Sequence, residues 1–235
     1  MLAVFKREMR SFFTSVIGYV FLVLFLAVGA AVFAYTTLYS MSASVTSFFA
    51  FMLIFSAIIL PLLTMKSFSE ERKSKTEQLL MTAPVSITAV VFGKFLASYV
   101  MFAGALLLNS LYFAILAPYA QVKVAILLGN IVALLLVGAV FVSIGLFVSS
   151  LTENQLSAAI GTIAIILVFL VIGLVNALLP SSYWLRFVID GISIFSRFQN
   201  FSSGIFDVSS LIYYLSMIAV FLYLTIRVYD RRRYS

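Results

Sequence analysis

The sequence is 235 residues long, and 64% of its residues are hydrophobic while only 10% are charged. A soluble domain is about half apolar, so this composition and a mean hydropathy of +1.18 exclude a soluble protein and predict an integral membrane protein. The chain has no cysteine and no histidine, which excludes disulfides, thiol nucleophiles, imidazole bases and the usual soft-metal sites. The net charge of +7 does not indicate nucleic-acid binding, because the basic residues lie at the ends of apolar runs, where lipid headgroups attract them.

Six apolar runs are each long enough to cross the roughly 30 Å hydrocarbon core of a bilayer as a helix. They cover residues 16–38, 48–65, 90–117, 124–148, 156–179 and 208–226. The runs lack the residue alternation of a transmembrane β-barrel. We therefore predict an all-α membrane protein with six transmembrane helices in one domain, residues 1–235. Pro61 is expected to bend the second span or to loosen its last turn.

The placement of the 15 lysine and arginine residues predicts the orientation of the chain. With both termini cytoplasmic, the outer side keeps only Lys123, Arg186 and Arg197, and the other basic residues lie on the inner side. This asymmetry obeys the positive-inside rule, and an even number of spans places both termini on one side. We predict a multi-pass protein of the plasma (inner) membrane, whose first span is retained rather than cleaved as a signal peptide.

The first fifteen residues, 1–15, combine an apolar pattern with positive charge. Apolar side chains recur at helical spacing, at Leu2, Phe5, Met9, Phe12 and Phe13. Lys6, Arg7 and Arg10 occupy other faces of the same helix. This pattern predicts a helix in the cytoplasmic membrane interface, with its apolar face against the lipid. The alternative is an ordinary positively charged flank of the first span.

The sequence contains no nucleotide P-loop that could supply energy from ATP. The only Gly-Lys pair, Gly93-Lys94, is followed by Phe95 and lacks the earlier glycine of a nucleotide P-loop. Lys94 is instead expected to extend from the start of the third span to the interface. The chain is thus predicted to be no enzyme and to bind no cofactor.

Polar groups deep in the predicted spans are few. Spans one, two, four and five have no ionisable residue in their central stretches, which argues against an ion-coupled carrier. Asn109 and Asn176 are the most polar groups at depth, and we expect them to form hydrogen bonds between helices. Gly138, Ser143 and Gly145 in the fourth span are expected to permit close helix contacts. Ser157 and Gly161 in the fifth span could do the same within the chain or in a dimer.

An outer segment, residues 180–207, separates the fifth and sixth spans. Its aromatic and aliphatic residues recur at helical spacing, from Trp184 to Phe198, with Arg186, Asp190 and Arg197 among them. We predict an outer interfacial or re-entrant segment before the sixth span. A folded external loop is the alternative.

The cytoplasmic loop between the second and third spans, residues 66–89, has an unusual density of charge. Six of the 23 charged residues of the chain fall between Glu70 and Glu77. Ser74 and Glu77 have the spacing of a capping box, and Glu71 and Lys75 that of a helical ion pair. We therefore predict a short cytoplasmic helix that ends before Pro84. Its apolar end contains three residues that need a partner protein for burial, Leu79, Leu80 and Met81.

The stretch EERKSKTEQLLMTAPVS, residues 70–86, resembles the cytoplasmic loop of ABC-2-type transporter permeases. Lys75 stands where that family usually has glycine, which is expected to make the segment more helical. The stretches GKF at residues 93–95 and FSRFQNFSSGIFD at residues 195–207 are also similar to the family. The most similar subgroup includes permeases of gliding-motility and nitrous-oxide-reductase maturation systems.

This resemblance implies a permease subunit of an ABC transporter, most simply an exporter. Two such subunits, identical or different, would assemble with two P-loop ATPase subunits that bind ATP and Mg²⁺. The loop between spans two and three would be the coupling helix that contacts the ATPase. The implied contact residues are Glu70, Glu71, Arg72, Lys75, Glu77, Leu79, Leu80 and Met81. The alternatives are a membrane scaffold without transport activity and an ion-coupled carrier.

Overall fold

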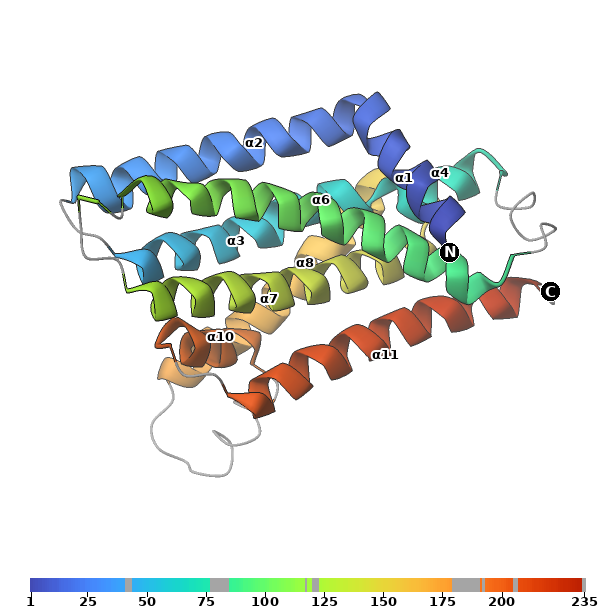
Figure 1. Ribbon diagram of the computed structural model, residues 1–235. Coiled ribbons are helices and arrows are strands. Elements are labelled where there is room, and N and C mark those ends of the chain that lie inside the picture. The colour runs from blue at the N-terminus through green and yellow to red at the C-terminus, as the bar shows by residue number, and fades with distance from the viewer. Residues whose placement is uncertain are drawn as a thin grey trace.

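Helices account for most of the chain in the computed structural model (Figure 1), and no strand occurs among its described residues. The described residues are 1–40, 44–76, 85–116, 118–119, 123–178, 191, 193–204 and 207–233. In chain order the helices are α1 (Leu2–Thr14), α2 (Val16–Phe33), the π-helix η1 (Ala34–Tyr39), α3 (Val45–Thr64), α4 (Lys66–Lys73), α6 (Ile87–Leu116), α7 (Val124–Leu151), α8 (Gln155–Leu178), α10 (Ile194–Ser202) and α11 (Val208–Arg233).

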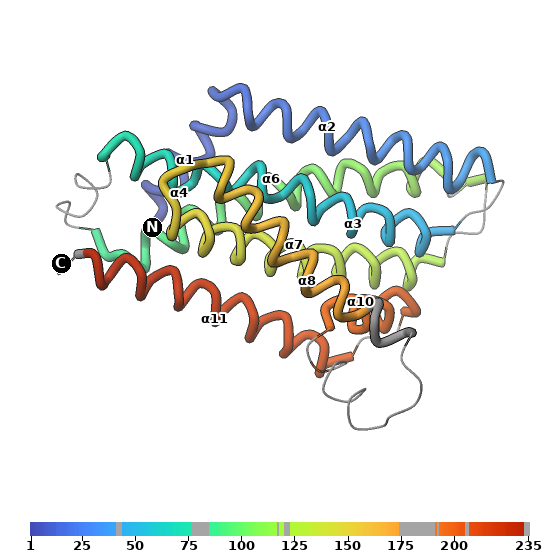
Figure 2. Tube along the Cα trace, turned by 180° about the vertical axis from the view of Figure 1, so that it is seen from behind, coloured from blue at the N-terminus to red at the C-terminus, as the bar shows by residue number. Residues whose placement is uncertain are grey.

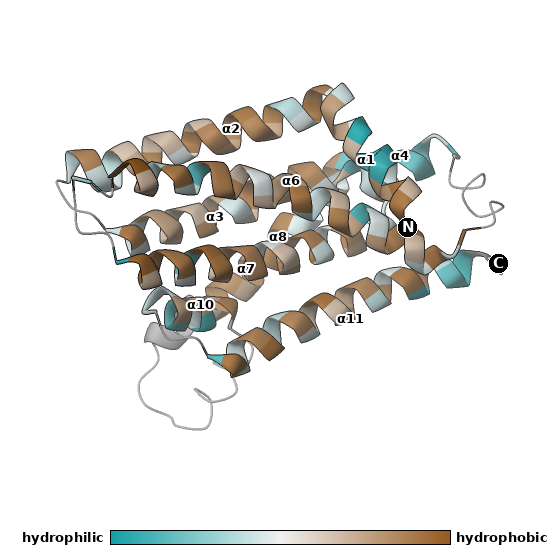
Figure 3. Ribbon diagram, in the orientation of Figure 1, coloured by the Kyte–Doolittle hydropathy of each residue, from teal (hydrophilic) through white to brown (hydrophobic). Residues whose placement is uncertain are grey.

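The six predicted spans are confirmed as six helices of sufficient length and hydropathy to cross a membrane. They are α2 with η1, α3, α6, α7, α8 and α11, and they lie side by side along one axis (Figure 1 and Figure 2). Both termini, α1 and α4 lie at one end of this bundle, and α10 lies at the other. Hydrophilic residues gather at the end with α1, α4 and the C-terminus, and also on α10 (Figure 3).

Helix α7 forms the centre of the bundle. In its most apolar stretch 72% of the residues are buried, compared with 17% in α11. Two glycines let neighbouring helices approach α7 closely, because a side chain at Gly138 would overlap Phe102 of α6 and one at Gly145 would overlap Thr64 of α3. The predicted close contacts of the fourth span are therefore confirmed at both glycines. Gly161 of α8 likewise faces Val148 of α7 within the chain.

Helix α1 packs against α6 and α2 at the end of the bundle. Phe5, Met9 and Phe12 face the bundle, and Phe12 is fully buried. Leu2 and Phe13 are exposed instead. The apolar residues of α1 thus do not form one lipid-facing surface, because three of them pack against the bundle. Contact with lipid at the interface remains a prediction for Leu2 and Phe13.

Helix α10 makes up most of the described part of the predicted outer segment. The Tyr214 hydroxyl of α11 donates to the Ile194 carbonyl (3.0 Å), and the Ser202 hydroxyl of α10 donates to Asn130 Oδ1 of α7 (2.8 Å). These bonds attach α10 to two spans at the end opposite the termini. Trp184, Arg186 and Asp190 lie outside the described residues.

Candidate functional site at the junction of α1, α4 and α6

Helix α4 carries the first predicted contact residues, Glu70, Glu71 and Arg72, and Lys75 lies in the turn that follows it. Glu77, Leu79, Leu80 and Met81 lie outside the described residues. Only Met65 separates α4 from α3, and its N–H still donates to the Pro61 carbonyl (2.8 Å). This interruption, one turn after Pro61, agrees with the expected loosening of the last turn of the second span.

Ser149 of α7 holds the interrupted backbone between α3 and α4. Its hydroxyl oxygen accepts the N–H groups of Phe68 (3.1 Å) and Ser69 (3.2 Å). The same hydroxyl donates to the Met65 carbonyl (2.9 Å). Buried backbone groups without a partner are costly, so one α7 side chain compensates for the break and fixes the start of α4 to the centre of the bundle.

Replacing Ser149 with alanine is expected to lower the free energy of unfolding by about 2 kcal/mol, because buried backbone donors would lose their acceptor. Unfolding in mixed detergent micelles, followed by loss of helicity, measures this change. Ser150→Ala is the matched control, because the Ser150 hydroxyl donates only to the Phe147 carbonyl of its own helix (2.6 Å). Equal stability losses in the two variants would contradict the role of Ser149.

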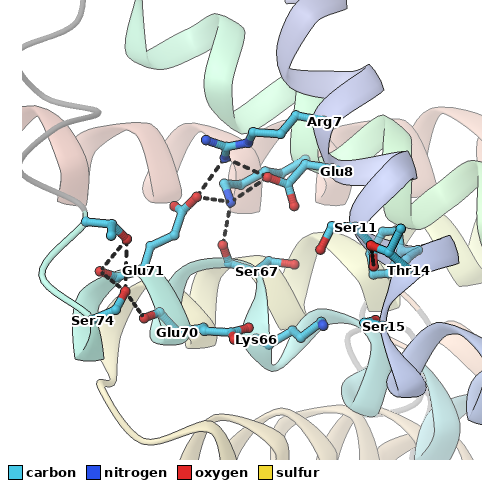
Figure 4. Close-up of a pocket in the computed structure, with 13 residues that line it drawn as sticks. Arg7, Glu8, Ser11, Thr14, Ser15, Lys66, Ser67, Glu70, Glu71 and Ser74 are labelled. Atoms are coloured by element: carbon cyan, nitrogen blue, oxygen red, sulfur yellow. Dashed lines mark hydrogen bonds and ion pairs between the residues drawn. The ribbon is translucent and has the colours of Figure 1, made fainter.

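Lys94 of α6 lies at the centre of an ion-pair cluster that joins three helices. Its ammonium is 3.1 Å from the Glu8 carboxylate of α1 and 3.0 Å from the Glu71 carboxylate of α4. It also donates to the Ser67 carbonyl (2.5 Å), and Arg7 is 2.7 Å from both carboxylates (Figure 4). The Lys94 side chain is only 1% exposed. The prediction that Lys94 extends to the interface is therefore wrong, because two carboxylates and a carbonyl hold it inside the protein.

The four charged groups of this cluster balance one another, which allows burial of Lys94 and the two carboxylates while Arg7 stays half-exposed. The side chains of Glu8 and Glu71 are 13% and 18% exposed, and each faces both Lys94 and Arg7. Burial alone would raise the pKa of Glu8, but the Lys94 ammonium and the Arg7 guanidinium outweigh it and hold this pKa below its usual value. The same carboxylates hold the pKa of Arg7 above its usual value, although burial opposes them.

The lowered pKa of Glu8 predicts acid sensitivity of the cluster. Because the folded pKa lies below the ordinary value of 4.5, the stability that Glu8 contributes is present above pH 4.5 and is lost as the pH falls through the folded pKa. Thermal unfolding temperatures measured in detergent between about pH 6 and pH 3 should fall at the acidic end. Glu8→Gln should flatten this dependence, and an unchanged profile would contradict the assignment.

Arg72 forms a second connection between α4 and the bundle. It lies 3.0 Å from Glu153, in the turn between α7 and α8, and donates to the Leu151 carbonyl (2.9 Å). Glu71 and Arg72 thus bind partners inside the chain, whereas Glu70 and Lys75 remain exposed. Sequence reasoning assigned all four to a partner protein, because the contacts that Glu71 and Arg72 make within the chain join segments distant in sequence.

The turn after α4 differs from the predicted capping box. Ser74 is the C-cap of α4, with helical backbone angles, and its hydroxyl donates to the Glu70 carbonyl (2.8 Å). An N-cap residue normally has an extended backbone, so an N-cap role of Ser74 does not fit these angles. Lys75 has a φ of +58°, in the left-handed region that ends helices and favours glycine. The expectation that Lys75 extends the helix, in an ion pair with Glu71, is therefore wrong.

A pocket of about 440 Å³ lies beside the ion-pair cluster, between α1 and α4. Six of its lining residues, all labelled in Figure 4, are Arg7, Glu8, Ser11, Ser15, Lys66 and Glu70. In Figure 4 the ammonium end of Lys66 points away from Glu71, towards Ser15. The pocket is lined by both charge signs and several hydroxyl groups, which suits a polar ligand rather than an apolar one.

One of the two asparagines predicted at depth forms a hydrogen bond between helices. Asn109 of α6 donates to the Phe25 carbonyl of α2 (3.2 Å), which confirms the expected bond between helices. The side chain of Asn176 lies outside the described part. Among the described residues, Lys94 is the only buried charged side chain, and its carboxylate partners lie at the end of the bundle. No group of metal-ligating side chains occurs in the part of the chain that the structure describes.

The comparison with protein families agrees with this architecture. The model of the ABC-2 family transporter proteins matches residues 2–233, which is almost the whole chain. A search of curated proteins finds no match to the chain. With six spans and a charged cluster at one end of the bundle, the chain belongs to the ABC-2 transporter family and is a membrane permease of an ABC transporter.

Proposed function

We propose that this permease exports its cargo with energy from ATP that separate P-loop ATPase subunits hydrolyse. The chain would form the transport path with a second permease subunit, in the plasma (inner) membrane and with both termini cytoplasmic. The ATPase subunits would bind the ATP and Mg²⁺. The positive-inside asymmetry supports this orientation, as does the location of both termini and α4 at one end of the bundle (Figure 1).

The observation that carries the proposal is the rigid attachment of α4 to three other elements. Glu71 connects it to α1 and α6 through Arg7 and Lys94, and Arg72 connects it to the turn after α7. A force applied to residues 77–84, which directly follow this end, would therefore move the bundle and not only a loop. A coupling segment needs such attachment, because it must transmit the movement of its partner.

The roles of the contact residues follow from their surroundings. We assign the apolar ATPase contact to Leu79, Leu80 and Met81, which need burial that a lone loop does not provide. Glu70, Lys75 and Glu77 would orient the partner. Glu71 and Arg72 would transmit the movement within the permease, since both form ion pairs there.

The interior of the bundle favours amphipathic cargo, such as a lipid-linked or peptidic compound, over small ions. Lys94 is the only buried charged side chain among the described residues, and it is already paired. Small ions would need charged or closely spaced polar ligands at depth. The cargo would thus be recognised mainly through apolar contacts.

Leu79→Asp and Leu80→Asp test the proposal. Each variant is expected to insert normally but to lose co-purification with the partner P-loop ATPase, because the charge would prevent burial of the contact. Tyr119→Asp is the control, since Tyr119 is 86% exposed, in the turn between α6 and α7 at the opposite end. Normal co-purification of both leucine variants would contradict the assignment. Transport that collapses with an uncoupler while ATP is maintained would indicate an ion-coupled carrier instead.

A further inference from the structure

The pocket between α1 and α4 contains two charged groups that the ion-pair cluster does not use. Arg7, Glu8, Glu71 and Lys94 pair with one another. Lys66 and Glu70 also line the pocket, and neither forms a side-chain ion pair or hydrogen bond among the described residues. The pocket therefore offers one cation and one carboxylate on the same helix, one turn apart. A ligand that carries both charges would complement them.

Ser15 supplies a polar group on the opposite wall. It is the N-cap of α2, but its side chain makes no capping hydrogen bond, and its hydroxyl oxygen is buried without a partner. The N-terminus of a helix carries partial positive charge and favours a phosphate. In Figure 4 the Lys66 ammonium points towards this residue, so a phosphate between Lys66 and Ser15 would satisfy both groups.

The position of the pocket indicates where such a ligand would come from. The first span starts at Val16, directly after Ser15, and its first exposed residues are apolar, namely Val16, Tyr19, Val20 and Val23. Lipid headgroups lie at the depth where a span begins. A headgroup in the pocket could therefore keep its acyl chains along the exposed face of α2.

We propose that the pocket between α1 and α4 binds the phosphoethanolamine headgroup of a membrane phospholipid. The phosphate lies between Lys66 and the Ser15 hydroxyl, which donates to it, and the primary ammonium donates to the Glu70 carboxylate. This site shares Glu70 with the proposed ATPase contact, but it can be tested without the ATPase because it requires only the permease and a lipid.

Lipid binding to the purified full chain in detergent tests this site. Native mass spectrometry would count bound phosphatidylethanolamine, phosphatidylcholine, phosphatidylglycerol and water-soluble glycerophosphoethanolamine during titration. Phosphatidylethanolamine should bind most tightly, about tenfold better than phosphatidylcholine, whose quaternary ammonium has no N–H to donate. Tighter binding of phosphatidylglycerol would overturn the role of Glu70. Equally tight binding of glycerophosphoethanolamine would overturn the lipid source and indicate a soluble ligand.

Substitutions locate the site. Lys66→Gln should weaken binding of phosphatidylethanolamine about tenfold, since a charged hydrogen bond to the phosphate is lost. Glu70→Gln should remove the preference over phosphatidylcholine. Lys73→Gln is the matched control, because Lys73 is an exposed cation of α4 outside the pocket. This variant should bind phosphatidylethanolamine as tightly as the unchanged chain does. Ser15→Ala provides a second test of the phosphate position and should also weaken binding. If the Lys66→Gln and Ser15→Ala variants both bind phosphatidylethanolamine as tightly as the Lys73→Gln variant does, the proposal is wrong.

Discussion

Replacing Lys94 with methionine is expected to lower the free energy of unfolding by about 3 kcal/mol, because removal of one partner from a buried ion pair leaves an uncompensated charge. Methionine keeps most of the apolar stem, so the loss reports mainly on the ammonium. The carboxylates of Glu8 and Glu71 would remain largely buried with only Arg7 beside them. Chemical unfolding in mixed micelles measures the change.

Two further variants make the Lys94 prediction specific. Lys73→Met removes an exposed cation of α4 and should change stability by less than about 0.5 kcal/mol. Glu8→Gln combined with Lys94→Met should cost less than the sum of the single changes, because the double variant buries one charge fewer. A Lys94 variant as stable as the Lys73 variant would show that the cluster contributes nothing to stability.

Replacing Gly18 with alanine should destabilise the protein by about 3 kcal/mol, at the upper end of the cost of overpacking. A Cβ at this position would lie 2.0 Å from the Phe12 carbonyl oxygen and 2.7 Å from its carbon. These are backbone atoms, so α1 as a whole would have to move away from α2. The displacement would also separate Glu8 from Lys94, and thermal unfolding measures the combined loss.

Gly104 supplies the control for this substitution. A Cβ on Gly104 would meet no atom within 4 Å, and alanine is the better helix former by up to about 1 kcal/mol. Gly104→Ala should therefore leave the unfolding temperature unchanged or raise it slightly. If Gly18→Ala and Gly104→Ala behaved alike, the close approach of α1 and α2 would not constrain the chain.

The transmembrane helices could be predicted from the sequence because each depends on a local property. A continuous apolar run of sufficient length forms a helix in lipid, whatever its neighbours are. The predicted run at residues 124–148 corresponds in this way to α7, Val124–Leu151. The largest difference is at the C-terminal end, where α11 continues to Arg233, because a helix does not have to end where its apolar part ends.

The candidate site was harder to predict because its contacts join distant parts of the chain. Lys94 and Glu8 are 86 residues apart in sequence, and no periodicity relates them. One signal was available, since Lys94 lies inside the predicted apolar run that begins at residue 90. At that depth within a helix, a charged side chain needs a partner. Lys75 was mispredicted for a local reason, as helix propensity says little about a residue at a helix end.

The hydrogen bonds of Ser149 have a consequence for biogenesis. Phe68 precedes Ser149 by 81 residues, so ribosomes synthesise α4 well before the residue that holds it. Until α7 has entered the membrane, the interrupted backbone after Pro61 lacks its partner, and the ion pairs of Glu71 with Arg7 and Lys94 connect α4 to the earlier helices. Assembly of the fourth span therefore completes the end of the bundle that carries α1 and α4, and a nascent chain that stops earlier would lack the Ser149 hydrogen bonds at the start of α4.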